Sequence, residues 1–102
     1  MENRTASLEP VVRAYQALVA MPAVGIRAAD WIVCRPTQIA SSGDLICARL
    51  GGAIVAGRLF RSAAGQPLFC DGRTGECHRI LKSDELEILG VVIAVRGEYA
   101  FH

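Results

Sequence analysis

Two different periodicities divide the chain at about residue 30. In the first part, apolar residues recur at helical spacing at Leu8, Val11, Val12, Tyr15, Leu18 and Val19. Ser7 stands where a helix N-cap would be, and Pro10 is tolerated in a first helical turn. The pattern favours an amphipathic helix over 8–19 that packs against a core. An extended conformation over 11–19 stays open, because a short apolar window fits either period.

From Asp30 onward, short β-branched and aromatic runs are separated by turn residues, which is typical of a small all-β domain. Gly51-Gly52 predicts a two-residue hairpin turn, because glycine readily adopts the positive φ that such a turn needs. The run from Leu86 to Arg96 is continuously apolar after Gly90, which indicates a central strand covered on both faces or a strand that faces a second copy. We expect strands near 30–35, 44–50, 53–61, 67–70, 78–81, 86–96 and 99–101, with turns at 41–44, 51–52, 64–67 and 71–72.

Length and charge restrict the classes of protein that fit. With 102 residues, the chain is expected to form a flexible terminus over 1–6 and a single domain over 7–102, because a second core would need roughly 50 residues of its own. Hydrophobic residues make up 52% of the chain and charged residues 21%, which suits a folded domain and not a membrane span. A formal charge of +1 lacks the positive excess that non-specific nucleic-acid binding requires.

Four cysteines raise the question of redox state and metal binding. No apolar signal segment precedes them, which indicates a cytoplasmic protein with reduced cysteines. Cys34 and Cys47 lie in apolar runs and are expected to be buried small residues. Cys70, Cys77 and His78 surround a turn and are candidate zinc ligands, although their spacing is not that of paired ligands. We therefore expect a turn without a cofactor there. A small metal- or ligand-binding β-domain is the alternative.

Side chains for catalysis are scarce. The only lysine is Lys82, which stands beside Ser83 in a polar run, where an exposed turn would keep the ammonium charged. One of the two histidines, His102, is the last residue. Inventory alone also allows a thiol-imidazole pair of Cys34 or Cys70 with His78, but no spacing supports it.

Four segments resemble successive strands of the C-terminal peptidase domain of LexA repressor, UmuD and related phage repressors, which shares its fold with signal peptidases. They are Asp30-Trp-Ile-Val-Cys-Arg35, Gly43-Asp-Leu-Ile-Cys-Ala-Arg-Leu50, Val55-Ala-Gly-Arg-Leu59 and Gly90-Val-Val-Ile-Ala-Val95. The resemblance covers residues 20–96 and implies a mostly β domain of short, largely antiparallel strands. It also implies an extended segment before the nucleophile, in conflict with the helix that the periodicity favours.

The resemblance also bears on catalysis. The family uses a serine, followed by methionine, and a lysine that burial keeps neutral. The Ser-Met pair falls on Ala20-Met21, and the lysine falls on Gly57, before Arg58-Leu59. Neither Ala20 nor Gly57 has a side chain for this chemistry. The resemblance thus implies an inactive domain whose cleft holds a peptide or a protein partner at Ala20, Met21, Pro22, Gly57 and Arg58.

Active members of that family dimerise through this domain. The resemblance therefore implies a homodimer, or a heterodimer with a peptidase or repressor relative, in a bacterial or phage regulatory pathway similar to the SOS response. Direct partners would be proteins, with neither nucleic acid nor membrane involved. A peptidase with an unrecognised dyad is the remaining alternative.

Overall fold

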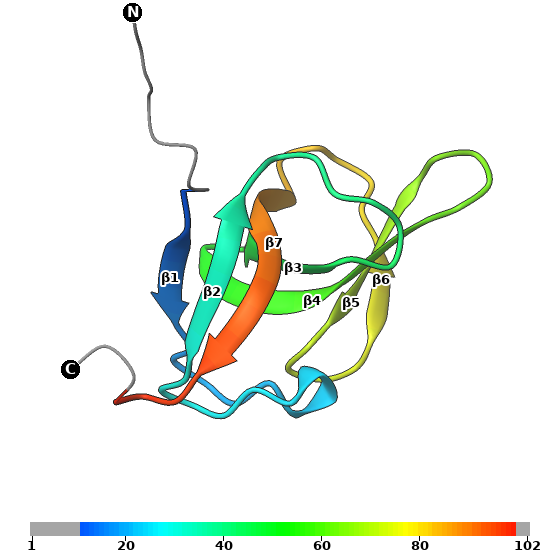
Figure 1. Cartoon of the computed structure of the whole chain (residues 1–102). Helices are drawn as coiled ribbons and strands as arrows, with labels where there is room; N and C mark the ends of the chain where they lie inside the picture. The colour runs from blue at the N-terminus through cyan, green and yellow to red at the C-terminus, as the bar shows by residue number, and fades with distance from the viewer. Residues whose placement is uncertain (1–10, 100–102) are drawn as a thin grey trace, which may run out of the picture.

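The computed structural model describes residues 11–99, which form an antiparallel β-sheet with one short 3-10 helix (Figure 1). The strands are β1 (Arg13–Gln16), β2 (Trp31–Pro36), β3 (Leu45–Leu50), β4 (Ala53–Arg61), β5 (Pro67–Asp71), β6 (Cys77–Arg79) and β7 (Leu86–Arg96), and the helix is η1 (Pro22–Val24). Their order across the sheet is β1-β2-β7-β3-β4-β5-β6. The prediction of a small, mostly β domain with antiparallel strands is confirmed. Within residues 11–99, no helix is long and apolar enough to cross a membrane.

The helix favoured over 8–19 is wrong for the part of it that the structure describes. Residues 13–16 form β1, which pairs with β2 from Arg13↔Cys34 to Gln16↔Trp31, and the Ala17 N–H extends the pairing to the Asp30 carbonyl at 2.8 Å. Four of the apolar residues in the helical pattern, Val11, Val12, Leu18 and Val19, are exposed. The backbone of this segment bonds to β2 instead of within a helix, so the apolar spacing does not mark a buried helix face.

Most of the remaining elements lie where the turn residues predict them. Gly51 and Gly52 adopt φ values of 57° and 85° and join β3 to β4 as a two-residue hairpin, with Leu50 opposite Ala53. The predicted strand over 99–101 is not present at Tyr99, which lies in a turn, and its other residues fall outside the described part of the chain. The same holds for the predicted flexible terminus over 1–6.

The long strand β7 is central, as predicted, because it lies between β2 and β3. Leu86 and Gly90 are buried, but residues 91–95 are covered less well. Ile93 is the extra residue of a β-bulge, since Val33 pairs with Ala94 while Cys34 pairs with Val92, and its side chain is 53% exposed. β7 is therefore central in the sheet but is not covered on both faces, since Glu87 in its first half is exposed as well.

Two hydrophobic clusters lie on opposite faces of the strands β3 and β4, whose successive side chains alternate between the faces. The first cluster contains Ala17, Met21, Ile26, Ile32, Cys34, Cys47 and Ala56. The second contains Ala40, Ile46, Ala48, Val55, Leu59, Phe69 and Leu86. β3 and β4 thus separate the two clusters and contribute side chains to both.

Candidate functional site

The segments that carry the two dyad-equivalent positions are in direct contact. Ala20 is exposed, whereas the next side chain, Met21, is fully buried, and its Sδ accepts a hydrogen bond from the Ala56 N–H at 3.1 Å. The turn after β5 joins them, because the Gly72 N–H donates to the Ala56 carbonyl at 2.9 Å and the Gly72 carbonyl accepts from Ala23 at 3.0 Å. The residue after Ala20 therefore touches the residue before Gly57.

Position 57 has no room for a side chain. A Cβ at Gly57 would overlap the Cys70 carbonyl oxygen and would lie 2.6 Å from Cζ of Phe69. Gly57 lies on the same face of β4 as Val55 and Leu59, so any side chain there would enter the second cluster. The buried Phe69 ring occupies the volume that the stem of a lysine would need.

The five residues predicted to form a cleft do not all reach the surface. Ala20, Pro22 and Arg58 are exposed, but Met21 and Gly57 are buried. The Arg58 guanidinium donates to the Gly43 carbonyl at 3.0 Å. None of the five lines the cavity beside Phe60 and Arg79, the one beside Ser83 and Asp84, or the one beside Tyr15 and Pro36. Met21 and Gly57 are therefore core residues, and only Ala20, Pro22 and Arg58 are accessible to a partner.

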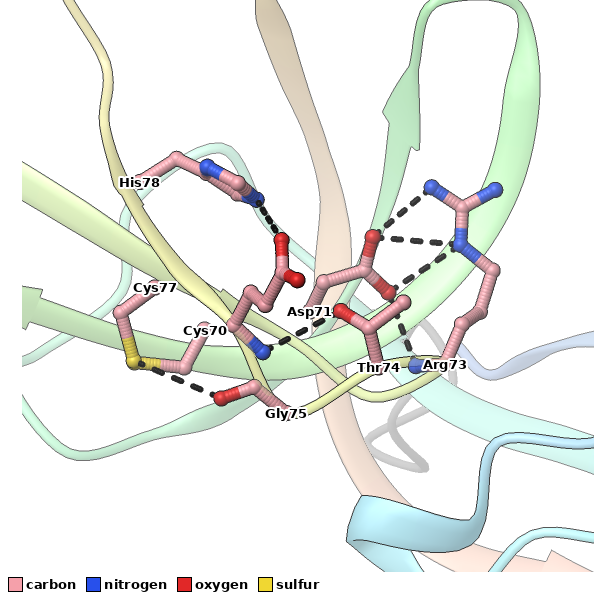
Figure 2. A network of polar contacts seen from close by, with 8 residues as sticks. Cys70, Asp71, Arg73, Thr74, Gly75, Cys77 and His78 are labelled. Atoms are coloured by element: carbon pink, nitrogen blue, oxygen red, sulfur yellow. Dashed lines mark hydrogen bonds and ion pairs between the residues drawn. A yellow bond between two sulfur atoms is a disulfide. The ribbon is translucent and has the colours of Figure 1, made fainter.

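The expectation that Cys70 and Cys77 stay reduced is also wrong. The two residues are a cross-strand pair of β5 and β6, and a disulfide joins them (Figure 2). Neither sulfur is then a thiolate, so the zinc alternative loses two of its three ligands. The exposed His78 points instead toward Glu76, with 3.8 Å between Nε2 and Oε1. Over residues 11–99, no group of three or more potential metal ligands from His, Cys, Asp and Glu comes together.

The other two cysteines are free and buried, as predicted. Burial raises the pKa of the Cys34 thiol, and burial together with the neighbouring Cys34 raises the pKa of Cys47 to about 12. Both therefore stay protonated at neutral pH and are poor nucleophiles. Cys34 lies in the first cluster on β2, while His78 lies on the edge strand β6, so the structure does not bring this thiol-imidazole pair together.

The Ser83/Lys82 pair is also unsuited to catalysis. Both residues are exposed in a turn between β6 and β7. The Glu85 carboxylate accepts hydrogen bonds from the backbone N–H groups of Lys82 at 2.9 Å and Leu81 at 2.7 Å, and these bonds lower the pKa of Glu85. The burial that a neutral catalytic lysine requires is not found at this turn.

Sequence reasoning missed a partly buried ion pair in the turn after β5. Asp71 is 4% exposed, and its carboxylate accepts hydrogen bonds from the Arg73 backbone N–H at 2.8 Å, from Nε at 3.1 and 3.2 Å and from Nη2 at 2.8 Å (Figure 2). These bonds lower the pKa of Asp71, and the charged carboxylate in turn raises the pKa of Arg73. The pair fixes the turn that contacts Ala23 and Ala56.

Over residues 11–99, the Ser83/Lys82 pair is exposed, the Cys34 thiol is buried away from His78, and no metal-ligand group is found. The buried Asp71 carboxylate holds the turn at 71–76. Compared with known proteins, the chain matches no family model and no curated sequence.

Proposed function

We propose that this protein is a catalytically inactive domain of the LexA/UmuD peptidase type that acts by binding another protein chain. The partner is a second copy or a catalytic relative, in a bacterial or phage regulatory pathway similar to the SOS response. The observation that carries the proposal is the contact between Met21 and Ala56. It brings together the two segments that the resemblance pairs, at Ala20 and Gly57, where neither the nucleophile nor the base is present.

Packing around Gly57 supports the loss of activity. An active dyad needs an amine within hydrogen-bond reach of the serine, together with burial that keeps this amine neutral. Here Phe69 fills the adjacent space, and the Cys70 carbonyl closes the other approach. At Gly57, where the resemblance places the base, core packing by Phe69 takes up the space that a lysine side chain would need.

A row of apolar residues that is partly exposed within residues 11–99 supports association with a chain of the same fold. Ala14, Val33 and Ala94 are direct cross-strand partners on β1, β2 and β7 and face away from the first cluster. The exposed Ile93 bulge lies beside Ala94 on the same strand, and β1 is an edge strand of the described sheet. A twofold interface places the same surface of two copies against each other, so this row would pack on its counterpart in the second chain. We infer that a second chain covers this row.

Sedimentation equilibrium over a range of concentrations tests the association. Wild type should dimerise, alone or on mixing with a catalytic LexA/UmuD-type peptidase, and Ala94→Glu should weaken the dimer at least tenfold, because it places a charge against an apolar partner surface. Ala63→Glu, a matched change in the exposed β4–β5 loop, should leave the dimer unchanged. A wild-type chain that stays monomeric both alone and in the mixture would refute the proposal.

Intact-mass analysis tests the absence of catalysis. The protein is incubated for days at mildly alkaline pH, alone and with a peptide substrate of the LexA/UmuD family. We expect both masses to remain unchanged, since Ala20 and Gly57 have no reactive side chains and Lys82 lacks the burial that a neutral base needs. New fragments that persist after removal of trace proteases would show that the domain is an enzyme.

A further inference from the structure

A surface cavity of about 410 Å³ lies between the β4–β5 hairpin and β6. Phe60, Leu68 and Arg79 are successive cross-strand partners on β4, β5 and β6, so their side chains share one face of the sheet and form one wall of the cavity. Pro67 adds a further apolar surface, and Phe60 is 38% exposed. The cavity is therefore open to solvent, and Phe60, Pro67 and Leu68 give it an apolar surface.

Two arginines give the cavity a positive charge that the described residues do not neutralise. Arg61 and Arg79 both line it, no aspartate or glutamate does, and neither arginine forms a salt bridge within residues 11–99. Arg49 and Arg73, by contrast, pair with Glu87 and Asp71. Guanidinium groups pair strongly with carboxylates, so the cavity favours an acidic ligand.

The backbone next to the cavity is an unpaired sheet edge, because β6 is the last strand in the described sheet. The Glu76 carbonyl accepts from Asp71 at 2.8 Å, and the Ile80 N–H donates to Pro67 at 3.0 Å. In an antiparallel pair, the residues that bond to the neighbour alternate with residues that point away. The backbone N–H and C=O groups of Cys77 and Arg79 therefore point outward.

The disulfide makes this short edge a stable docking surface. β6 contains only three residues, which alone would be a marginal strand. The bond between Cys70 and Cys77 ties its first residue to β5 and keeps Arg79 opposite Leu68. The outward groups of β6 are thus held in place before any partner binds, which lowers the entropic cost of binding.

We propose that β6 and this cavity bind an extended, acidic segment of a partner protein, which adds to the sheet as a further strand. Its backbone bonds to Cys77 and Arg79, a glutamate or aspartate pairs with Arg79 and Arg61, and an apolar side chain packs on Phe60 and Leu68. Strand addition supplies affinity through the main chain, and the cavity supplies specificity. The site is independent of the proposed dimer surface, because β6 and β1 are opposite ends of the strand order.

Fluorescence anisotropy with three labelled peptides tests the proposal. In the first, leucine and glutamate alternate along one face of an extended chain, and threonine fills the other face. The second has lysine in place of glutamate, and the third carries N-methyl groups on the backbone nitrogens that would bond to β6. We expect saturable binding of the first peptide only. Equal binding of the lysine peptide would overturn the acidic specificity, equal binding of the methylated peptide would overturn strand addition, and no binding of the first would overturn both.

Matched variants locate the site. Arg79→Gln and Arg61→Gln should each weaken binding of the first peptide by about threefold to tenfold, as for loss of a partly solvated charged hydrogen bond. Arg27→Gln, an exposed change in the loop before β2, should have no effect. Amide hydrogen exchange at Cys77 and Arg79 should slow on binding, and the same spectra verify that each variant is folded. Unchanged affinity in both cavity variants would overturn the proposal.

The dimer variant separates this proposal from the proposed function. Ala94→Glu should bind the first peptide with the affinity of wild type, since the altered residue lies on β7 and outside the cavity. Loss of peptide binding in a folded Ala94→Glu protein would place the peptide at the dimer surface and would overturn the β6 site.

Discussion

Among single residues, Asp71 should contribute measurably to stability through its hydrogen bonds to Arg73. Asp71→Asn should lower the free energy of unfolding at neutral pH by about 1–3 kcal/mol, because the buried carboxylate accepts four hydrogen bonds from Arg73 that a neutral amide cannot all accept. Urea denaturation followed by the fluorescence of Trp31, the only tryptophan, measures the change. Asp84→Asn, at an exposed aspartate, is the control and should be neutral within about 0.5 kcal/mol.

The same pair sets a pH dependence with a definite sign. The pKa of Asp71 is lower in the folded state than in the unfolded chain, so its stabilisation is complete above the unfolded value, about 3.9, and is lost as the pH falls through the folded pKa. Wild type should therefore lose stability below about pH 4 more steeply than Asp71→Asn. Parallel curves for the two proteins in this range would contradict the role given to the carboxylate.

The lack of space for a side chain at Gly57 should also affect stability. Gly57→Ala should destabilise the protein by about 1–3 kcal/mol, because the added Cβ meets the Phe69 ring and a backbone carbonyl. Gly97→Ala is the matched control, since a Cβ there meets nothing within 4 Å and its φ is not in the left-handed region. Thermal unfolding of both variants measures the difference. Equal midpoints for the two would show that position 57 has free space, in which case Gly57→Lys could place an amine there.

At the scale of elements, the β5–β6 hairpin depends on its disulfide. Its cysteines are seven positions apart, and a closed loop of that size is worth about 2–3 kcal/mol in the chain-entropy account. Dithiothreitol should lower the stability of wild type by up to this amount and should not affect the Cys70→Ser/Cys77→Ser variant, because Cys34 and Cys47 are already free. Thiol titration in denaturant should give two thiols before reduction and four after it. Four thiols before reduction would contradict the assignment.

The elements also show how far the sequence determines the fold and the site. β4 and β7 begin and end where the residue pattern predicts, because glycine turns and long apolar runs delimit them locally. The helix favoured over 8–19 is wrong at Arg13–Gln16, because an exposed edge strand shows no alternation of polar and apolar residues, and the extended alternative left open over 11–19 holds there. The disulfide had a usable signal: Cys70 and Cys77 flank one turn symmetrically, which places them opposite each other in a hairpin. The closure of Gly57 by Phe69 had none, since it depends on the register between β4 and β5.

At the scale of the whole molecule, the two clusters should unfold together. Ala56 belongs to the first cluster and Val55 to the second, although the two are neighbours on β4, and Cys47 and Ala48 divide in the same way on β3. A strand that leaves the sheet therefore exposes both clusters at once. This sharing predicts a single cooperative transition, as is usual for a domain of this size.

A pair of matched substitutions tests the cooperativity. Ile32 lies in the first cluster and Ile46 in the second, and both are fully buried. Ile32→Val and Ile46→Val remove the same methylene group and should each cost about 0.5–1.5 kcal/mol. Because the clusters share β3 and β4, each variant should shift the urea midpoint seen by Trp31 fluorescence and the midpoint seen by far-ultraviolet circular dichroism by the same amount. If Ile46→Val moves the dichroism transition and leaves the fluorescence transition in place, the clusters unfold separately, and β3 and β4 do not couple them.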